Sequence, residues 1–261
     1  MAGNRRVRRV AAVSISRLGF PRHSTETSMK KLLITGITAI SFLFTSFSQP
    51  PYECYFPFEE GISFQRTYYD ATGQITAISN AGIDSIAKMG HFYRAFIRDT
   101  MLDDKNKEIG RRIFTVDCTD DVIHLSANQL LNPCMTEAYQ SMDMGISGEG
   151  IRIPHRLVVG VELPKGGNRI DVTSEGLEIV TLNFEIVDRK VEAREHITTP
   201  AGKFECFRIR ETVQFQTMFL TRTYTTLGWY AKKVGLVRQE TYDQKGVLRS
   251  RMELTVLGMG R

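Results

Sequence analysis

Residues 62–74 read Ile62-Ser-Phe-Gln-Arg-Thr-Tyr-Tyr-Asp-Ala-Thr-Gly-Gln74, and this stretch decides the fold class. From Ile62 to Tyr69 two sets of side chains alternate with a period of two, and Arg66 and Tyr68 fall on the same face as Ile62 and Phe64. Such alternation is typical of a β-strand with one face on a core. The stretch then ends in Tyr-Asp-x-x-Gly, in which Asp opens a type I turn and Gly closes it. The pattern predicts a strand followed by a hairpin.

The same alternation recurs in three later segments of the chain. They are Leu182 to Ile186, Phe207 to Phe215 with Glu211 on the apolar face, and Leu248 to Val256, where Leu248, Ser250, Met252, Leu254 and Val256 share one face. The segment 242–247 repeats the Tyr-Asp-x-x-Gly turn, 165–168 and 200–203 predict two more hairpins, and 103–107 predicts a further connection. Many strands joined by hairpins favour an all-β fold, an antiparallel β-barrel or half-barrel.

One segment, residues 126–148, lacks this pattern. Ser126 is placed to cap a helix over Ala127 to Leu131, Pro133 interrupts it, and a second short helix is expected from Thr136 to Met142. We predict a short helical or irregular insertion near residues 126–148, packed over one mouth or face of the sheet.

A secretory signal peptide begins at Met29 rather than at residue 1. Lys30 and Lys31 precede an apolar run from Leu32 to Phe44, and small residues follow at Ser46 and Ser48. The run is shorter than the roughly 20 apolar residues of a transmembrane helix. We therefore expect residues 29–48 to be a signal peptide, residues 49–261 to be a single β-rich domain, and the mature chain to have no transmembrane span.

Residues 1–28 are rich in arginine and hold one acidic residue, Glu26. They fit either an organelle transit peptide or an upstream extension before a true start at Met29, and the Met-Lys-Lys sequence favours the extension. The full chain has 34 Lys and Arg against 29 Asp and Glu. Residues 1–48 hold eight of the basic residues and one acid, so residues 49–261 carry a net charge of −2. The mature chain therefore has no basic excess for binding nucleic acid.

Four cysteines, Cys54, Cys118, Cys134 and Cys206, lie in the expected mature chain. An even number in an oxidising compartment predicts one or two disulfides, and Cys118–Cys134 is favoured because it closes a short loop. The alternative is that they are buried free thiols, which pack as small hydrophobic groups.

Motifs for catalysis are weak. Gly145-Ile-Ser-Gly-Glu149 fails the nucleophile-elbow pattern at its last position, and His91, His124, His155 and His196 lack metal-ligand spacing. We expect no enzymatic activity, no metal site and no cofactor.

Binding is better supported by the side chains present. Trp229 and Tyr230 combine apolar area with a polar tip and could line a pocket. Met135, Met142 and Met144 could form an adaptable cover over an apolar ligand. For both sets plain core packing is the competing interpretation.

Three phrases, taken together and in order, carry a resemblance to a family. They are Cys54 to Gly61, Ile197 to Cys206, and Trp229-Tyr-Ala231 with Val234-Gly-Leu-Val237 and the second Tyr-Asp turn. They resemble the TapB-like exported proteins, a group related to a larger domain-of-unknown-function family of Gram-negative bacteria, from about Cys54 to Leu257. The resemblance implies a signal peptide, a periplasmic or outer-membrane-associated location and a barrel-like β fold. It implies no catalytic residues.

Two functions follow as hypotheses, with a third, an unrecognised hydrolase, less favoured. The first is binding of a lipid or other apolar small molecule in or on the barrel, which predicts a hollow interior. The alternative is a structural or assembly factor of the cell envelope with a protein partner, which predicts a filled interior and an exposed apolar patch or sheet edge.

Overall fold

The computed structural model describes residues 53–126 and 143–259, and within these ranges its regular structure is entirely β-strand. The described residues fall in one compact unit. The twelve strands are β1 (Ile62–Asp70), β2 (Ile75–Met89), β3 (Phe92–Leu102), β4 (Glu108–Cys118), β5 (Val122–Leu125), β6 (Asp143–Pro154), β7 (Gly166–Ser174), β8 (Leu177–Thr199), β9 (Gly202–Gln216), β10 (Thr221–Ala231), β11 (Gly235–Tyr242) and β12 (Leu248–Met259).

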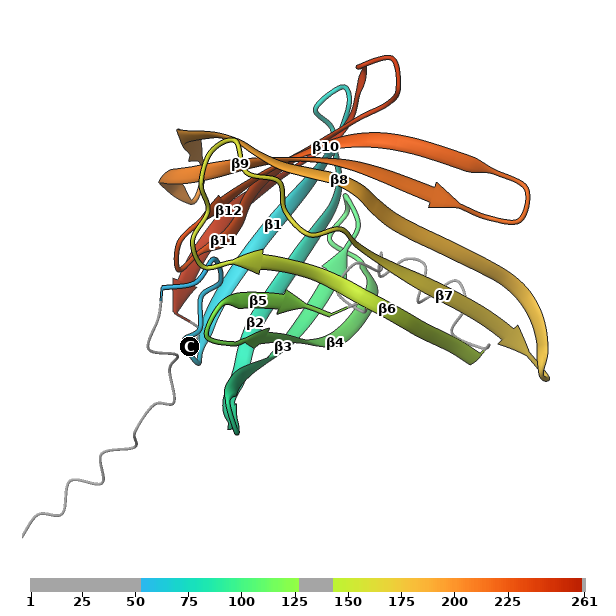
Figure 1. The fold of residues 1–261 in the computed structure, drawn as a ribbon, viewed down its shortest axis with the longest axis horizontal. Coiled ribbons are helices and arrows are strands. Elements are labelled where there is room, and N and C mark those ends of the chain that lie inside the picture. The colour runs from blue at the N-terminus through green and yellow to red at the C-terminus, as the bar shows by residue number, and fades with distance from the viewer. Residues whose placement is uncertain (1–52, 127–142, 260–261) are drawn as a thin grey trace, which may run out of the picture. The chain divides into compact units, whose positions relative to one another are not determined.

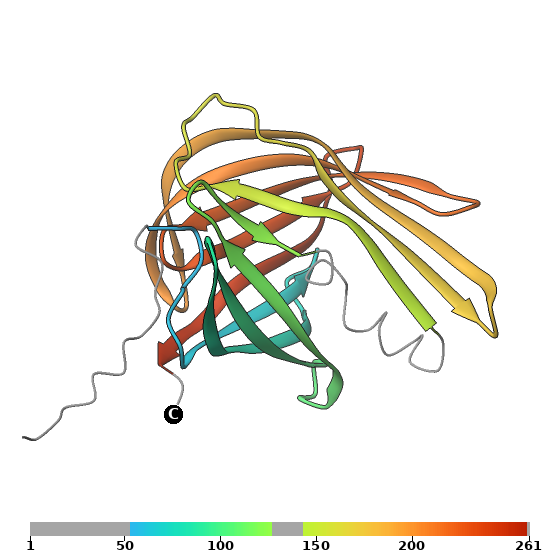
Figure 2. The ribbon, with the colours of Figure 1, turned by 60° about the horizontal axis from the view of Figure 1, so that its bottom comes forward.

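The strands form one closed antiparallel ring (Figures 1 and 2). Each strand pairs with the strands before and after it in the sequence, and β12 returns to pair with β1 from Ile62↔Met259 to Asp70↔Ser250. The prediction of an antiparallel barrel or half-barrel is thus confirmed in its closed form. Closure pairs the first strand with the last, so neither terminal strand is left as an unpaired edge. Because β5 has only four residues, Glu108–Thr115 of β4 and Asp143–Gly150 of β6 are paired on one side only among the described residues.

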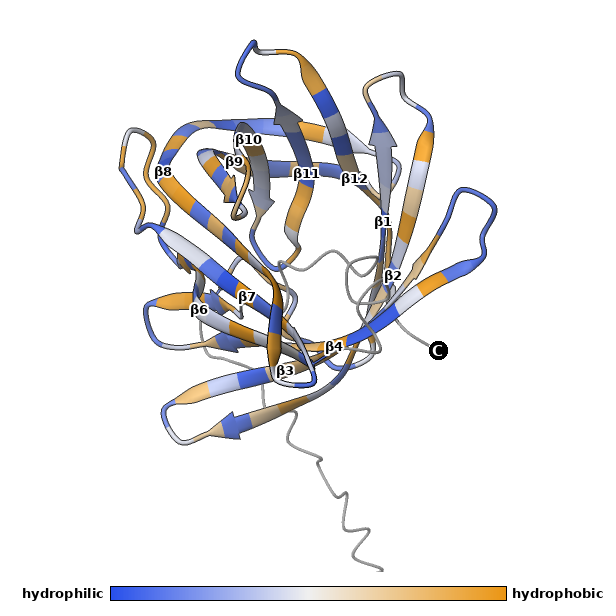
Figure 3. Ribbon diagram, turned by 90° about the vertical axis from the view of Figure 1, so that its right-hand side faces the viewer, coloured by the Kyte–Doolittle hydropathy of each residue, from blue (hydrophilic) through white to orange (hydrophobic). Residues whose placement is uncertain are grey.

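Hydrophobic and hydrophilic residues alternate along the strands, as seen in the view along the ring (Figure 3). Phe64 on β1, Leu182 on β8, Ile209 on β9 and Leu254 on β12 are all buried, as the predicted faces require. Two members of the predicted β12 face depart from it, because Ser250 is exposed and Val256 is half exposed. The β1–β12 register shifts between Gln65 and Arg66, so an extra residue on β12 reverses the alternation after Leu254.

Three of the four predicted hairpin turns are confirmed, at 70–74, 200–201 and 243–247. The fourth is wrong, because β7 begins at Gly166 and residues 155–165 make the β6–β7 connection. Gly166 and Gly167 serve a different purpose. A Cβ on Gly166 would lie 2.4 Å from the carbonyl oxygen of Gly150, and one on Gly167 would lie 2.7 Å from that of Phe184. The neighbouring backbones come too close there for a side chain.

The predicted insertion at residues 126–148 is corrected in part. Residues 143–148 belong to β6 and pair with β7 from Asp143↔Thr173 to Gly148↔Asn168. The two helices expected before them fall on residues 127–142, outside the described residues.

Residues Cys54–Phe58, called the N-terminal plug below, cover the interior at the end of the ring where β10 finishes and β11 begins. The backbone N–H of Lys233 donates a 2.8 Å hydrogen bond to the carbonyl of Cys54. Tyr55 and Phe56 are buried, and Phe56 packs edge-on against Phe64 with ring centroids 6.4 Å apart. The plug therefore closes one end of the barrel with aromatic side chains.

Candidate ligand-binding cavity

A hollow of about 630 Å³ lies inside the ring and is lined by residues of the plug and of every strand except β7. Native interiors normally contain few voids larger than a water molecule. The volume instead lies within the roughly 300–1,000 Å³ of small-molecule sites. The cavity runs from Tyr55 and Phe56 at the plug to Thr76 and Tyr224 near the hairpin end of the ring.

Most of the wall is apolar because it is built from the inward faces of the alternating strands. The apolar side chains come from strands distant in sequence and include Met101, Ile151, Ile186, Val213 and Met252. Each is at least 90% buried despite facing the hollow. Such a surface favours an apolar ligand, by about 25 cal/mol for each Å² removed from water.

Two carboxylates face the interior, and each is held by an arginine. Glu211 forms an ion pair with Arg189, whose side chain is fully buried, and its carboxylate oxygen lies 2.8 Å from the Nε of that arginine. Asp99 forms a 2.8 Å ion pair with Arg112 and accepts a 2.7 Å hydrogen bond from the hydroxyl of Ser79. Both acids are therefore occupied as structural partners.

Arg66 differs from these two arginines. Its Nε is buried and has no hydrogen-bond partner, and within the described part of the chain no carboxylate forms an ion pair with it. Its guanidinium carbon lies 4.5 Å from the ring centre of Phe64, so a cation–π contact holds one face. Burial lowers the pKa of Arg66, and the charge of Arg112 acts in the same direction.

Three tyrosines add neutral hydroxyl groups to the wall. Burial raises the pKa of Tyr55 to about 12, and burial also raises the pKa values of Tyr68 and Tyr230. Their phenols therefore stay protonated at neutral pH and can donate hydrogen bonds.

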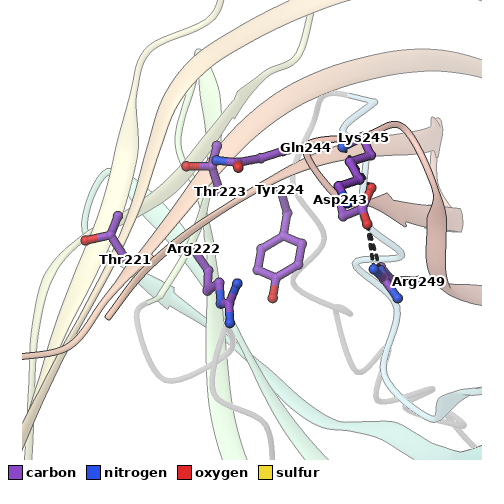
Figure 4. A pocket seen from close by; sticks show the side chains of 8 residues that line it. All are labelled: Thr221, Arg222, Thr223, Tyr224, Asp243, Gln244, Lys245 and Arg249. Carbon is purple, nitrogen blue, oxygen red and sulfur yellow. Dashed lines mark hydrogen bonds and ion pairs between the residues drawn. The ribbon is translucent and has the colours of Figure 1, made fainter. Parts of the chain in front are cut away.

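A second, polar hollow of about 600 Å³ lies at the hairpin end, between β10 and the β11–β12 turn (Figure 4). Arg222 and Lys245 line it, together with Asp243, which is paired with Arg249 at 2.6 Å. Tyr224 lines both this hollow and the interior cavity, so the two adjoin. A mainly basic rim thus lies beside an apolar interior.

Residues 59–254 match the DUF3108-like family model. The match covers most of the chain and all twelve strands except the end of β12. This chain belongs to the DUF3108-like family. No curated protein matches it. The more specific TapB-like assignment stays a prediction.

Two solved structures share the fold of this chain. One, described as a "putative lipoprotein" of Parabacteroides distasonis ATCC 8503, is 21% identical, with a TM-score of 0.68 over 80% of this chain and all of the other. The second, described as a "putative exported protein with YmcC-like fold" of Bacteroides fragilis NCTC 9343, is also 21% identical, with a TM-score of 0.65 over 79% and 99% of the two chains. At this identity the likeness shows the fold alone.

The predicted binding residues of this DUF3108-like chain are only partly placed by the structure. Tyr230 lies on the cavity wall, whereas Trp229 is buried elsewhere and donates a 2.8 Å hydrogen bond from Nε1 to Glu195. Met135 and Met142 lie outside the described residues. Met144 is on β6, and its side chain is not described.

Sequence reasoning placed Arg66 on the inward face without naming it as a site residue, and it missed Arg189 altogether. The signal for Arg66 was present, because it shares a face with Phe64 and Tyr68 in the alternating run. For Arg189 the sequence contains no such signal, because the β8–β9 register shifts between Ile186 and Asp188 and this shift changes which residues face inward.

The three described cysteines, Cys54, Cys118 and Cys206, are buried and have free thiols. A hydrogen bond from Cys118 lowers the pKa of Cys54, whereas burial raises that of Cys206 to about 12. Cys134, the predicted partner of Cys118, lies outside the described residues.

No cluster of three or more His, Cys, Asp or Glu side chains that could hold a metal ion occurs in residues 53–126 and 143–259. Over the same ranges, no helix has the length and hydropathy needed to cross a membrane.

Proposed function

We propose that this protein is exported to the bacterial envelope and binds a lipid or another apolar small molecule inside its barrel. One observation carries the proposal: a 630 Å³ hollow with mainly apolar walls, enclosed by strands whose buried side chains form one large hydrophobic cluster. Apolar side chains of this wall favour an apolar occupant, because contact with one removes their surface from water.

Binding fits the wall chemistry better than catalysis does. A general acid or base needs a carboxylate, imidazole or similar group free to exchange a proton with substrate. Glu211 and Asp99, the acids at the interior, are instead held by arginine ion pairs at 2.8 Å. Export is supported by the Met-Lys-Lys leader and apolar run at residues 29–44.

Native mass spectrometry with lipid extraction, on protein purified gently from cells, tests the proposal. We expect a stoichiometric apolar ligand, and we expect the purified protein to bind the uncharged probe N-phenyl-1-naphthylamine. The substitution Val213→Trp projects a bulky ring into the cavity and should strongly weaken both signals. Val256→Trp, on the half-exposed outer face of β12, is the matched control and should keep both. A ligand-free mass together with no probe binding would refute the proposal.

A second candidate, an assembly factor that contacts an envelope protein, is favoured by one surface feature. The β9–β10 hairpin ends in Met218, Phe219 and Leu220, and Phe219 is 91% exposed. Exposed apolar side chains gathered at a tip often mark a contact site. A photo-crosslinking residue at position 219 should then capture a protein in cells, whereas one at Gln244, on another turn, should not.

A further inference from the structure

We propose that the interior cavity selects an amphiphile with an oxyanion headgroup, a carboxylate or phosphate on an apolar chain, and that Arg66 is its main contact. This inference rests on the proposed binding function and names the ligand class.

Arg66 is placed for this role by the closing strand pair. On β1 it pairs with Ser79 of β2 and Leu254 of β12, and it lines the cavity between Phe64 and Tyr68 on the same face. Phe64 covers one face of its guanidinium at 4.5 Å. The side chain is therefore oriented by its neighbours, and its buried Nε still lacks an acceptor.

The charges around the cavity leave one positive charge uncompensated. Arg66, Arg112 and Arg189 are set against Asp99 and Glu211, and both acids are already paired, with Arg112 and Arg189. A buried charge without a partner is expensive, and arginine cannot lose its proton to escape the cost. An oxyanion supplied by a ligand would provide the negative charge that Arg66 lacks and would accept a hydrogen bond from its Nε.

Further donors lie close to Arg66. Tyr68 lies two residues from Arg66 on the same face of β1, and Tyr68 and Tyr230 line the same cavity as Arg66. Because these phenols are protonated, they can add neutral hydrogen bonds to the same oxyanion. The apolar walls beyond, including Ile186 and Val213, would hold the chain of the amphiphile.

The test compares three ligands of equal chain length: dodecanoate, dodecyl phosphate and dodecan-1-ol. Each displaces N-phenyl-1-naphthylamine from the purified full-length protein, which gives its Kd. In the wild-type protein we expect at least one anion to bind roughly 10- to 100-fold more tightly than the alcohol, as charge-assisted hydrogen bonds require. The tighter of the two anions identifies the headgroup.

Arg66→Met should remove this preference while leaving dodecan-1-ol affinity nearly unchanged, and Arg66→Lys should keep part of it. Arg98→Met, which removes an exposed arginine paired with Asp84, is the control and should retain the full preference. Circular dichroism and thermal unfolding show that each variant is folded.

The outcomes separate the two proposals. If the alcohol and the anions bind equally to the wild type, or if Arg66→Met weakens all three alike, the headgroup inference is wrong while interior binding stands. If neither the probe nor any dodecyl ligand binds, both proposals fail.

Discussion

Arg189 is the largest side chain among the fully buried residues described, and it links three parts of the barrel. Besides its ion pair with Glu211, its Nη1 donates to the carbonyls of Arg152 at 2.9 Å and Pro164 at 3.0 Å. It thereby fastens the end of β6 and the β6–β7 connection to β8 and β9. Its Nη2 has no partner, so the group is incompletely satisfied.

Removing one member of this pair should be much worse than removing both. Glu211→Leu leaves the buried guanidinium without a counter-charge, and we expect a loss of about 3–5 kcal/mol in the free energy of unfolding. Glu211→Leu combined with Arg189→Met should recover most of that loss, because no buried charge remains. Urea denaturation of the three proteins measures this. Equal stability of the single and double variants would contradict it.

At the scale of single elements, three turns repeat one design. In each, the side chain of an aspartate accepts hydrogen bonds from the backbone N–H groups two and four residues later, at 2.8–3.0 Å: Asp70, Asp103 and Asp243. The residue three positions after the aspartate has a positive φ. It is Gly73 (87°), Asn106 (62°) or Gly246 (75°).

The left-handed position in these turns predicts opposite results for two substitutions. Gly246→Ala should lower the free energy of unfolding by about 1 kcal/mol, because a Cβ is strained at this φ. Asn106→Gly should be neutral or slightly stabilising, because the asparagine already bears that strain. Thermal unfolding of both variants beside the wild type gives the comparison, and a stabilising Gly246→Ala would contradict the turn geometry.

The same turns predict a pH dependence. The hydrogen bond from the Thr72 side chain lowers the pKa of Asp70, and that from the Val247 backbone lowers the pKa of Asp243. A carboxylate with a depressed pKa in the folded state stabilises above its unfolded pKa, and the effect is lost as pH falls below about 4. The stability difference between wild type and Asp243→Ala should therefore shrink between pH 6 and pH 2.5. A constant difference would count against this role.

The element scale also shows how far sequence reasoning reached. Two Tyr-Asp-x-x-Gly turns and the inward position of Glu211 were predictable, because turn chemistry and alternation are local signals. The inward position of Arg189 and the exposure of Val256 were not, since each follows a register shift that leaves no mark in the sequence. The cavity was expected only as one alternative, because inward-facing side chains can fill a barrel or line a hollow.

For the whole barrel, the decisive feature is the pairing of its first and last strands. Sequence patterns indicated hairpins but left an open half-barrel as an alternative, because β1 and β12 are separated by nearly the whole domain. The structure aligns Ser63 of β1 with Gly258 of β12, and a Cβ on Gly258 would meet nothing within 4 Å.

A disulfide at that position should test closure directly. Ser63→Cys with Gly258→Cys should oxidise readily, because paired residues have Cα separations suited to a disulfide. By closing a loop of nearly the whole domain, it should stabilise the fold by about 5 kcal/mol in the chain-entropy model. Ser63→Cys with Ser250→Cys is the control, since Ser250 pairs with Asp70 at the other end of the strand. Intact-mass measurement detects the loss of two hydrogens, and failure of the first pair to oxidise would contradict the closed ring.

Ring closure also fixes the order in which the barrel can be completed. Eleven of the twelve pairings join consecutive strands and can form as the chain lengthens, but the twelfth joins β12 to β1. A chain emerging from a ribosome or an export channel therefore carries two unpaired strand edges until its last strand is free. During that interval the chain is most prone to aggregate through these edges. A chaperone or holding factor would therefore prevent most aggregation by binding just before the final strand arrives.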